Sequence, residues 1–142
     1  MYSIITFDIS DKEKCDIAFA IRNTVFVEEQ KVSREEEYDE HESVARHYLL
    51  FSDGLPAGTA RMRSTEKGVK LERFAVLPQF RNKGAGAALV SRVLADALAF
   101  GKTIYLHAQV AAMNLYKRSG FTAEGELFYE AGIPHYKMVY TG

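Results

Sequence analysis

The chain has 142 residues, of which 47% are hydrophobic, and its formal net charge at pH 7 is −1. This size and composition fit one globular domain with its own hydrophobic core, so we expect a single domain over residues 1–142. A net charge so close to zero gives no reason to expect a nucleic-acid partner.

The cysteine, the histidines and the apolar runs of the sequence exclude several classes of protein. Cys15 is the only cysteine, so the chain can form no internal disulfide and no cysteine-rich metal site, and a reducing cytoplasm fits best. The first residues, Met1–Ile5, lack the basic start of a signal peptide, and no apolar run reaches membrane-spanning length. The four histidines show no ligand spacing such as H-E-x-x-H. We therefore expect a cytoplasmic protein with no metal and no membrane partner.

The N-terminal third is predicted to form a strand, a helix and an acidic segment. Residues 2–9 form the strand, and Ser10 or Asp11 is a suitable N-cap for the helix. Cys15 is interpreted as a small hydrophobic residue of its buried face rather than as a nucleophile. Six acidic residues then crowd positions 35–42. They form either a solvated surface, which we favour, or a rim that attracts a cationic amine.

An antiparallel meander is expected next. Strands over residues 46–51 and 56–63 flank the hairpin pair Asp53-Gly54, and a turn at Lys67-Gly68 leads into the strand Leu71–Val76. Pro78 ends this last strand because proline supplies no ladder donor. His47, at the start of the meander, is assigned a structural role.

A glycine-containing turn over residues 81–86 follows, with the sequence Arg-Asn-Lys-Gly-Ala-Gly, and then a helix that Gly101 closes. The first N–H groups of a helix have no intrahelical partner, and small residues let an anion approach them. Arg81 and Lys83 would add positive charge. The turn is therefore either a phosphate-binding loop or a tight turn with exposed basic residues, and on its own it leaves both open. It lacks the Lys-Ser or Lys-Thr of a P-loop and the third glycine of a dinucleotide fingerprint.

The last third completes the sheet. Residues 103–108 read as a strand parallel to Leu71–Val76, because a helix crosses between the two. A short helix over 111–119 and a hairpin with strands 121–130 and 135–140 follow, with the turn at 131–134. Such a βαβ unit places the glycine turn and both strand ends at one edge of the sheet, where open α/β sheets bind ligands.

Arg81, Gly84 and Gly86 form the pattern Arg-x-x-Gly-x-Gly, which resembles the pyrophosphate loop of the GNAT superfamily of acyl-CoA N-acyltransferases. The stretch 116–121, Tyr-Lys-Arg-Ser-Gly-Phe, is similar to the end of the GNAT CoA-binding helix. Segments 22–30 and 129–135 resemble the ElaA-like or YjcF-like subgroup. The resemblance implies an α/β (α+β) GNAT fold, with a mixed, mostly antiparallel sheet of six to seven strands, about four helices and a central βαβ acyl-CoA-binding unit.

The resemblance also implies a reaction. In GNAT enzymes an amine attacks the acyl-CoA thioester directly and expels the CoA thiolate, so the Val76 N–H would polarise the thioester carbonyl and Tyr116 would protonate the sulfur. Gln109 stands where many members have asparagine. The implied CoA-binding residues are Phe74, Ala75, Val76, Arg81, Asn82, Lys83, Gly84, Ala85, Gly86, Ala87, Gln109 and Tyr116.

The group that accepts the amine proton is left open by the sequence. Glu72 would share a side with Phe74 and Val76 by the period of two, and it could order a water chain or form a cross-strand salt bridge. His107 and His135 have suitable intrinsic pKa values. The acceptor-site candidates are Arg22, Glu29, His107 and His135.

The resulting hypothesis is an N-acetyltransferase that uses acetyl-CoA as co-substrate and acts on a small amine or a lysine-like amino group. The alternative is a regulatory module that binds acyl-CoA without turnover. A phosphotransferase is disfavoured because the P-loop lysine is absent. The sequence leaves homodimer formation open.

Overall fold

The computed structural model describes residues 1–142 and contains one seven-stranded sheet of order β1-β2-β3-β4-β5-β7-β6. Four α-helices accompany it, and no helix combines the length and the apolar character needed to cross a membrane. The strands are β1 Tyr2–Phe7, β2 Arg46–Ser52, β3 Leu55–Thr65, β4 Gly68–Val76, β5 Ile104–Gln109, β6 Phe121–Glu130 and β7 Ile133–Tyr140. The helices are α1 Lys12–Arg22, α2 Arg34–Glu37, α3 Ala85–Leu98 and α4 Met113–Arg118.

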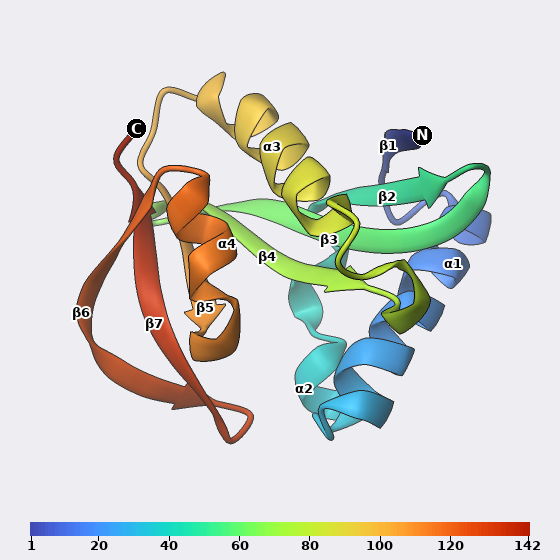
Figure 1. Cartoon of the computed structure of the whole chain (residues 1–142), viewed down its shortest axis with the longest axis horizontal. Coiled ribbons are helices and arrows are strands. Elements are labelled where there is room, and N and C mark those ends of the chain that lie inside the picture. Colours follow the sequence, from blue (N-terminus) through green and yellow to red (C-terminus); the bar gives the residue numbers. More distant parts are fainter.

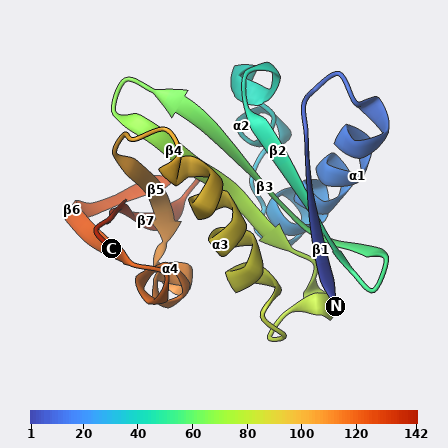
Figure 2. The same cartoon turned by 90° about the horizontal axis from the view of Figure 1, so that it is seen from above.

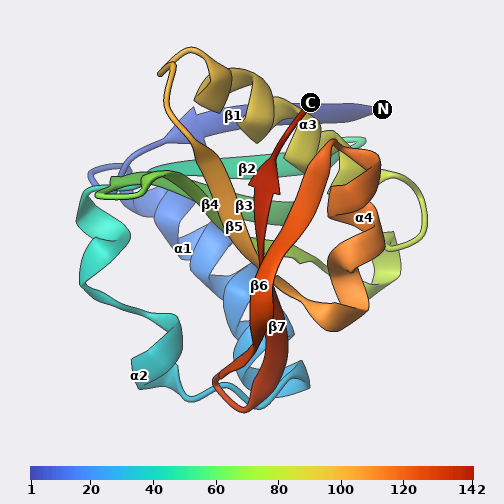
Figure 3. The same cartoon turned by 90° about the vertical axis from the view of Figure 1, so that its left-hand side faces the viewer.

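The helices cover the two faces of the sheet unequally. Helix α3 crosses one face, while α1 and α2 lie on the other (Figures 1 and 2). Each face has its own buried cluster: Leu89 and Val93 of α3 pack in the larger one, and Ala18 and Ile21 of α1 pack in the smaller. Figure 3 shows β6 and β7 turned across the end of this sandwich, with α4 beside them. The predicted mixed and mostly antiparallel sheet of six to seven strands, with about four helices, is confirmed.

The predicted βαβ unit is present, but its two strands separate early. Strands β4 and β5 pair in parallel only through Val69–Leu71 and Ile104–Leu106, whereas every other neighbouring pair of strands is antiparallel. Beyond Leu71 the strands diverge, as Figure 1 shows. The edge of β4 from Arg73 to Val76 therefore has no strand partner on the β5 side.

A β-bulge at Arg73 changes which side chains share a face of β4. Glu72 pairs with Arg61 and Ala75 with Thr59, so the two residues 73 and 74 lie opposite the single Ala60. Arg73 has φ +60°, in the left-handed region. An extra residue shifts the alternation by one position.

This shift overturns the predicted placement of Glu72. Leu71 is buried in the α3-side cluster, and Phe74 and Val76 pack against that same cluster after the bulge. The side chain of Glu72, next to Leu71, points to the other face of the sheet. The expectation that Glu72 shares a side with Phe74 and Val76 is wrong because a strict period of two does not allow for the bulge.

Several predicted boundaries also change. Helix α1 begins after the expected N-cap Asp11 but continues from Asn23 to Glu29 as π-helical turns, which the sequence pattern did not reveal. The last hairpin turn is Ala131-Gly132 alone, at φ +51° and +76°, so β7 already starts at Ile133. Two residues with positive φ make the tight turn that joins twisted strands, and the predicted turn over 131–134 is too long. Short 3₁₀ segments lie at Glu40–Ser43, Pro78–Phe80 and Val110–Ala112.

The acidic segment is not simply a solvated surface. Glu37 and Glu42 are buried because both bind Arg22 of α1, whose side chain is 1% exposed. The Arg22 guanidinium donates to Glu37 Oε2 at 2.5 Å and to both Glu42 oxygens at 2.7 and 2.9 Å. His47 is buried beside them, with Nε2 2.8 Å from the Glu42 carbonyl oxygen, which confirms its structural role. The favoured solvated-surface interpretation is therefore wrong for two of the six acids.

Arg22→Ala is expected to lower the free energy of unfolding by about 3–5 kcal/mol, because it leaves two buried carboxylates without their main partner. Urea denaturation at neutral pH measures this loss. Lys12→Ala is the matched control, since Lys12 forms an exposed pair with Asp16 and its removal should change stability little. A loss no larger than that of the control would contradict the structural role of Arg22.

Candidate active site

A cavity of about 930 Å³ occupies the region where β4 and β5 diverge. Its lining comes from β4, β5, the N-terminus of α3, α4, the β6–β7 hairpin and the segment after α1. It contains every residue predicted to bind CoA except Lys83: Phe74, Ala75, Val76, Arg81, Asn82, Gly84, Ala85, Gly86, Ala87, Gln109 and Tyr116. The structure therefore gathers at one cavity the residues that the sequence motifs place on separate elements.

The unpaired edge of β4 turns backbone groups toward this cavity. Leu77 N–H donates to the Ala57 carbonyl at 2.9 Å, on the β3 side. Backbone groups alternate between the two edges of a strand, so those of Val76, and of Phe74 two residues earlier, face the β5 side. The Val76 carbonyl there accepts a hydrogen bond from Arg81 Nε at 2.9 Å. The N–H groups of Phe74 and Val76 thus have no strand partner and face the cavity.

The N-terminus of α3 offers a second set of free donors. Gly84 is the N-cap, at φ +86°, and no side chain caps the helix. The first helical hydrogen bond runs from Ala88 N–H to the Gly84 carbonyl at 3.0 Å. The N–H groups of residues 85–87 therefore have no helical acceptor, and they carry the positive end of the helix dipole. A Cβ placed on Gly84 would meet no atom within 4 Å, so the approach is open.

Arg81 does not contribute a free positive charge. Its guanidinium holds the Glu29 carboxylate through two hydrogen bonds of 2.7 Å, while its Nε is committed to the Val76 carbonyl. This pair lowers the pKa of Glu29 and joins the segment after α1 to the turn before α3. The expected charge of Arg81 on the loop is thus largely neutralised, and Glu29, an acceptor-site candidate, lies at the cavity as a partner of Arg81.

Tyr116 stands on α4 with its ring packed edge-on against Phe74 at 5.8 Å and Phe121 at 6.4 Å. Its hydroxyl makes no hydrogen bond within the protein, although the residue lines the cavity. Burial raises the pKa of the Tyr116 phenol above its ordinary value, so the group keeps its proton at neutral pH. The arrangement leaves one proton donor available to a molecule in the cavity.

Three polar side chains from the β5 and β7 side complete the cavity. Gln109 donates to the Gln30 side-chain oxygen at 2.8 Å, a partner that the sequence did not suggest. His107 Nδ1 lies 2.6 Å from Glu130 Oε1, and His135 Nδ1 lies 2.6 Å from the Ile133 carbonyl oxygen. Both histidines and Glu130 line the cavity.

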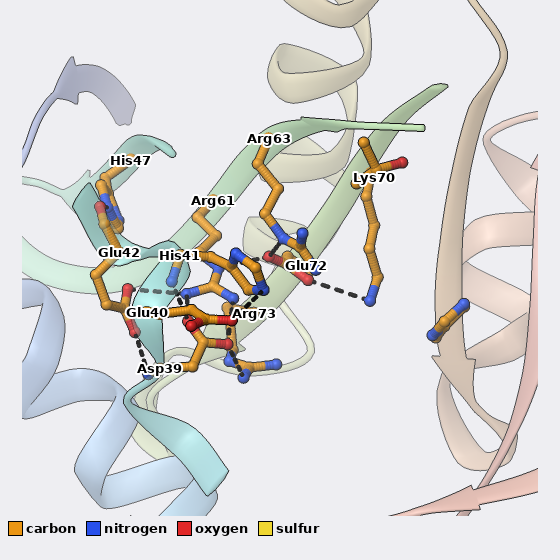
Figure 4. A network of polar contacts seen from close by, with 12 residues as sticks. Asp39, Glu40, His41, Glu42, His47, Arg61, Arg63, Lys70, Glu72 and Arg73 are labelled. Atoms are coloured by element: carbon orange, nitrogen blue, oxygen red, sulfur yellow. Dashed lines mark hydrogen bonds and ion pairs between the residues drawn. The ribbon is translucent and has the colours of Figure 1, made fainter. Parts of the chain in front are cut away.

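Glu72 is held in a cross-strand ion-pair cluster. Its Oε2 accepts from Arg61 Nε at 2.6 Å and from Arg63 Nε at 2.7 Å, and Lys70 Nζ is 3.3 Å from its other oxygen (Figure 4). Burial alone would raise the pKa of Glu72, but these cations outweigh it and lower the pKa to about 2. A carboxylate so stabilised is a poor proton acceptor. Of the two alternatives for Glu72, the structure shows the salt bridge.

The sequence matches the family model described as "Acetyltransferase (GNAT) domain" over residues 8–141. The chain belongs to the GNAT acetyltransferase family. The uncharacterized N-acetyltransferase YjcF of Bacillus subtilis is 37% identical over 132 residues, which cover 91% of this chain and 94% of YjcF. The crystal structure of Escherichia coli ElaA matches with a TM-score of 0.88 and 25% identity over 98% of this chain and 99% of ElaA. An acyl-CoA N-acyltransferase from Pseudomonas aeruginosa matches with a TM-score of 0.87 and 27% identity over 99% of this chain and 100% of that one.

The resemblance to acyl-CoA N-acyltransferases of the ElaA-like or YjcF-like subgroup is thus confirmed, but one predicted acceptor residue is misplaced. Arg22 does not line the cavity of this GNAT domain, because its guanidinium is buried on Glu37 and Glu42. Arg73, which the sequence analysis missed, does line it, and its guanidinium lies 3.3 Å from both Glu37 and Asp39. Only the bulge, invisible in a single sequence, brings Arg73 there.

The pKa of Glu72 makes the stability of this GNAT domain depend on pH in acid. Because the folded-state pKa is lowered from 4.5 to about 2, the stabilisation is complete above about pH 4.5 and is lost as the pH falls toward 2. Between about pH 5 and pH 2 the wild type should lose about 3 kcal/mol more than Glu72→Gln in urea denaturation. Glu66→Gln, in the exposed β3–β4 turn, should follow the wild type. Equal acid dependence in wild type and Glu72→Gln would contradict the ion-pair assignment.

Proposed function

We propose that the protein transfers an acetyl group from acetyl-CoA to a primary amine. One observation carries this proposal: the free donors at the N-terminus of α3 and the free edge of β4 open into the same cavity. The first set suits a pyrophosphate and the second suits the amide groups of an extended pantetheine arm. Acyl-CoA contains both groups in one molecule.

The pyrophosphate would lie against the N–H groups of residues 84–87. Anions are stabilised there by unpaired donors and by the helix dipole, and small residues permit close contact. Since Arg81 is bound to Glu29, backbone donors and the exposed Lys83 would supply most of the attraction. Asn82, at φ +63°, shapes the turn that leads into them.

The pantetheine arm would extend along β4 as an added strand. The backbone N–H and C=O groups of this edge have lost their pairing with β5, and a buried backbone group without a partner is costly. The N–H of Val76 is suited to hold the thioester carbonyl oxygen, and so is that of Phe74, which lies two residues closer to the bulge. A donor aimed at a developing oxyanion contributes roughly 3 kcal/mol to the transition state.

Tyr116 is suited to protonate the departing sulfur. Its hydroxyl has no protein acceptor, and burial keeps it protonated. The C–S bond breaks when the amine nitrogen has bonded to the carbonyl carbon, and a proton from Tyr116 prevents the thiolate from returning. Its position against Phe74 places it on the β4 side of the cavity.

Charge favours a cationic acceptor. Seven carboxylates line the cavity, and an arginine or His107 holds five of them: Glu29, Glu37, Asp39, Glu72 and Glu130. Glu35 and Glu36 are exposed and make no ion pair with a basic side chain. A negative field attracts an ammonium group, such as that of a small amine or a lysine-like side chain. This acidic side of the cavity supports the amine-attracting interpretation of the acidic segment.

Gly86→Glu is expected to weaken acetyl-CoA binding by roughly 100-fold or more, since a carboxylate would occupy the place of a phosphate. Gly86 has no positive φ, and an acidic residue in the first turn suits the helix dipole, so the variant should fold. Ser91→Glu adds the same charge at an exposed position of α3 and is the control. Isothermal titration with acetyl-CoA, and with ATP for comparison, measures the affinities. Absence of acetyl-CoA binding by the folded wild type would refute the proposal.

Tyr116→Phe is expected to lower kcat by roughly 100-fold while acetyl-CoA affinity stays within a few-fold, because the ring packing is kept and only the proton donor is lost. Release of CoA thiol with a panel of primary amines measures the rate. Tyr48→Phe, a buried phenol on β2 that does not line the cavity, is the control. Tight acetyl-CoA binding by the wild type without turnover of any amine would favour the alternative, a regulatory module that binds acyl-CoA.

A further inference from the structure

We infer that His107 accepts the proton of the attacking amine. We further infer that the Glu130 carboxylate holds the His107 ring in position and stabilises the imidazolium that forms. The inference rests on the proposed acetyl transfer and assigns the group that this reaction requires but that the sequence left open. At neutral pH an ammonium of pKa about 10.4 must lose one proton before it attacks, and the bonded nitrogen must lose a second, so the reaction needs a group that accepts a proton.

His107 and Glu130 meet close to the point where the pairing of β4 with β5 ends. His107 follows Leu106, the last residue of β5 that pairs with β4, and it is therefore the first β5 side chain past the junction. Glu130 is the last residue of β6 and lies across β7 from β5. His107 Nδ1 and Glu130 Oε1 are 2.6 Å apart, and both residues line the cavity.

The carboxylate determines which ring nitrogen is free. The hydrogen bond from His107 lowers the pKa of Glu130 more than burial raises it, so Glu130 is ionised and can only accept. Nδ1 must then carry the hydrogen, which leaves the lone pair on Nε2. Nε2 of His107 makes no hydrogen bond within the protein. A base whose other nitrogen is held by a carboxylate is the arrangement that general-base catalysis uses elsewhere.

The nearby lysines are paired with other acids, so the Glu130 carboxylate is available to the His107 imidazole. Lys70 of β4 is held by Glu72 at 3.3 Å, and Lys137 of β7 by Glu124 at 3.3 Å. The other titratable groups near His107 are His135 of β7, which lines the cavity, and Tyr105 of β5, whose ring centroid lies 6.0 Å from that of His107. Phe128 packs edge-on against His107 at 5.0 Å and limits the positions of the ring.

His135 is the obvious competitor, and its surroundings differ in one respect. Its Nδ1 is bound to the Ile133 carbonyl, a neutral acceptor, and its ring is stacked on Phe128 at 5.9 Å. An ionised carboxylate stabilises an imidazolium far more than a carbonyl does. Glu72 is excluded by its three cations. His107 alone combines a place at the cavity, a free ring nitrogen and a carboxylate partner.

The proton balance is simple. The ammonium first loses one proton to water. The resulting amine nitrogen forms the bond to the thioester carbonyl carbon, and the proton that this nitrogen then loses passes to His107 Nε2. The C–S bond breaks, its electron pair goes to sulfur, and Tyr116 protonates the thiolate. The imidazolium then loses a proton and the phenolate gains one through water, which leaves an N-acetyl amide and CoA thiol.

The first test needs no reaction. Two-dimensional ¹⁵N NMR of the histidine rings in the protein without acetyl-CoA should show neutral His107 as the Nδ1–H tautomer. Glu130→Gln should perturb the His107 ring signals, whereas Glu126→Gln, the same change at an exposed position of the same strand, should leave them unchanged. An Nε2–H tautomer in the wild type would overturn the inference.

The second test uses kinetics with the best primary amine of the panel. His107→Ala should lower kcat/KM by roughly 100- to 1,000-fold with unchanged acetyl-CoA affinity, and added imidazole should restore part of the rate. Glu130→Gln should lower kcat/KM by roughly 10-fold and move the ascending limb of its pH profile to lower pH, because the base loses its charge partner. Glu126→Gln should retain both the wild-type rate and the wild-type profile.

The outcomes separate the two proposals. If wild type neither binds acetyl-CoA nor acetylates any amine, acetyl transfer itself fails. If wild type is active and His107→Ala is not impaired, or His135→Ala alone shows the loss and the imidazole rescue, the assignment of His107 fails while acetyl transfer stands. A rate loss in Glu130→Gln with an unshifted pH profile would reduce Glu130 to a structural residue and contradict its assigned role.

Discussion

Strand β4 is hydrogen-bonded along both edges only as far as Leu71. The bulge at Arg73 adds one residue against β3, and the pairing with β5 ends two residues earlier. Bulges increase the local twist of a strand, which agrees with the divergence of β4 from β5. The cavity, the free N–H groups of Phe74 and Val76 and the position of His107 all depend on this interruption. Backbone groups left without partners favour a ligand that can supply them, and an extended chain with amide groups does so.

The bulge in turn is held by charge. Arg73 has a left-handed backbone conformation, which costs a non-glycine residue of order 1 kcal/mol. Its guanidinium binds Glu37 and Asp39 from the segment that follows α1, and Arg61 binds Asp39 and Glu72. Arg22 anchors the same segment from α1. The ion-pair network therefore joins the bulged strand to the acidic side of the cavity, so a change in either would be felt in the other.

The sequence predicted what local pattern determines. The periodicity of apolar residues predicted the strands and α3, and glycine and proline predicted most of the turns. The spacing of Arg81, Gly84 and Gly86 indicated a family resemblance, and that resemblance predicted the fold. Prediction from the sequence failed where a long-range contact decides where a side chain lies. The acids at 37 and 42 look solvated until Arg22 binds them. Glu72 is expected on the same face of β4 as Phe74 and Val76, but the bulge places it on the other face. The partnership of His107 with Glu130 joins residues 23 positions apart across an intervening strand, and no short motif records it.

The acid and the base of the proposed reaction have opposite environments. Tyr116 has lost water without gaining a hydrogen-bond partner, so burial disfavours its ionised form and keeps it a donor. His107 is held at Nδ1 by the Glu130 carboxylate, which leaves Nε2 as the nitrogen that can accept a proton. Each group is thus set by its surroundings to one direction of proton transfer. Tyr116 packs on Phe74 of β4 and His107 stands on β5, so the divergence of these two strands also separates the proposed donor from the proposed acceptor.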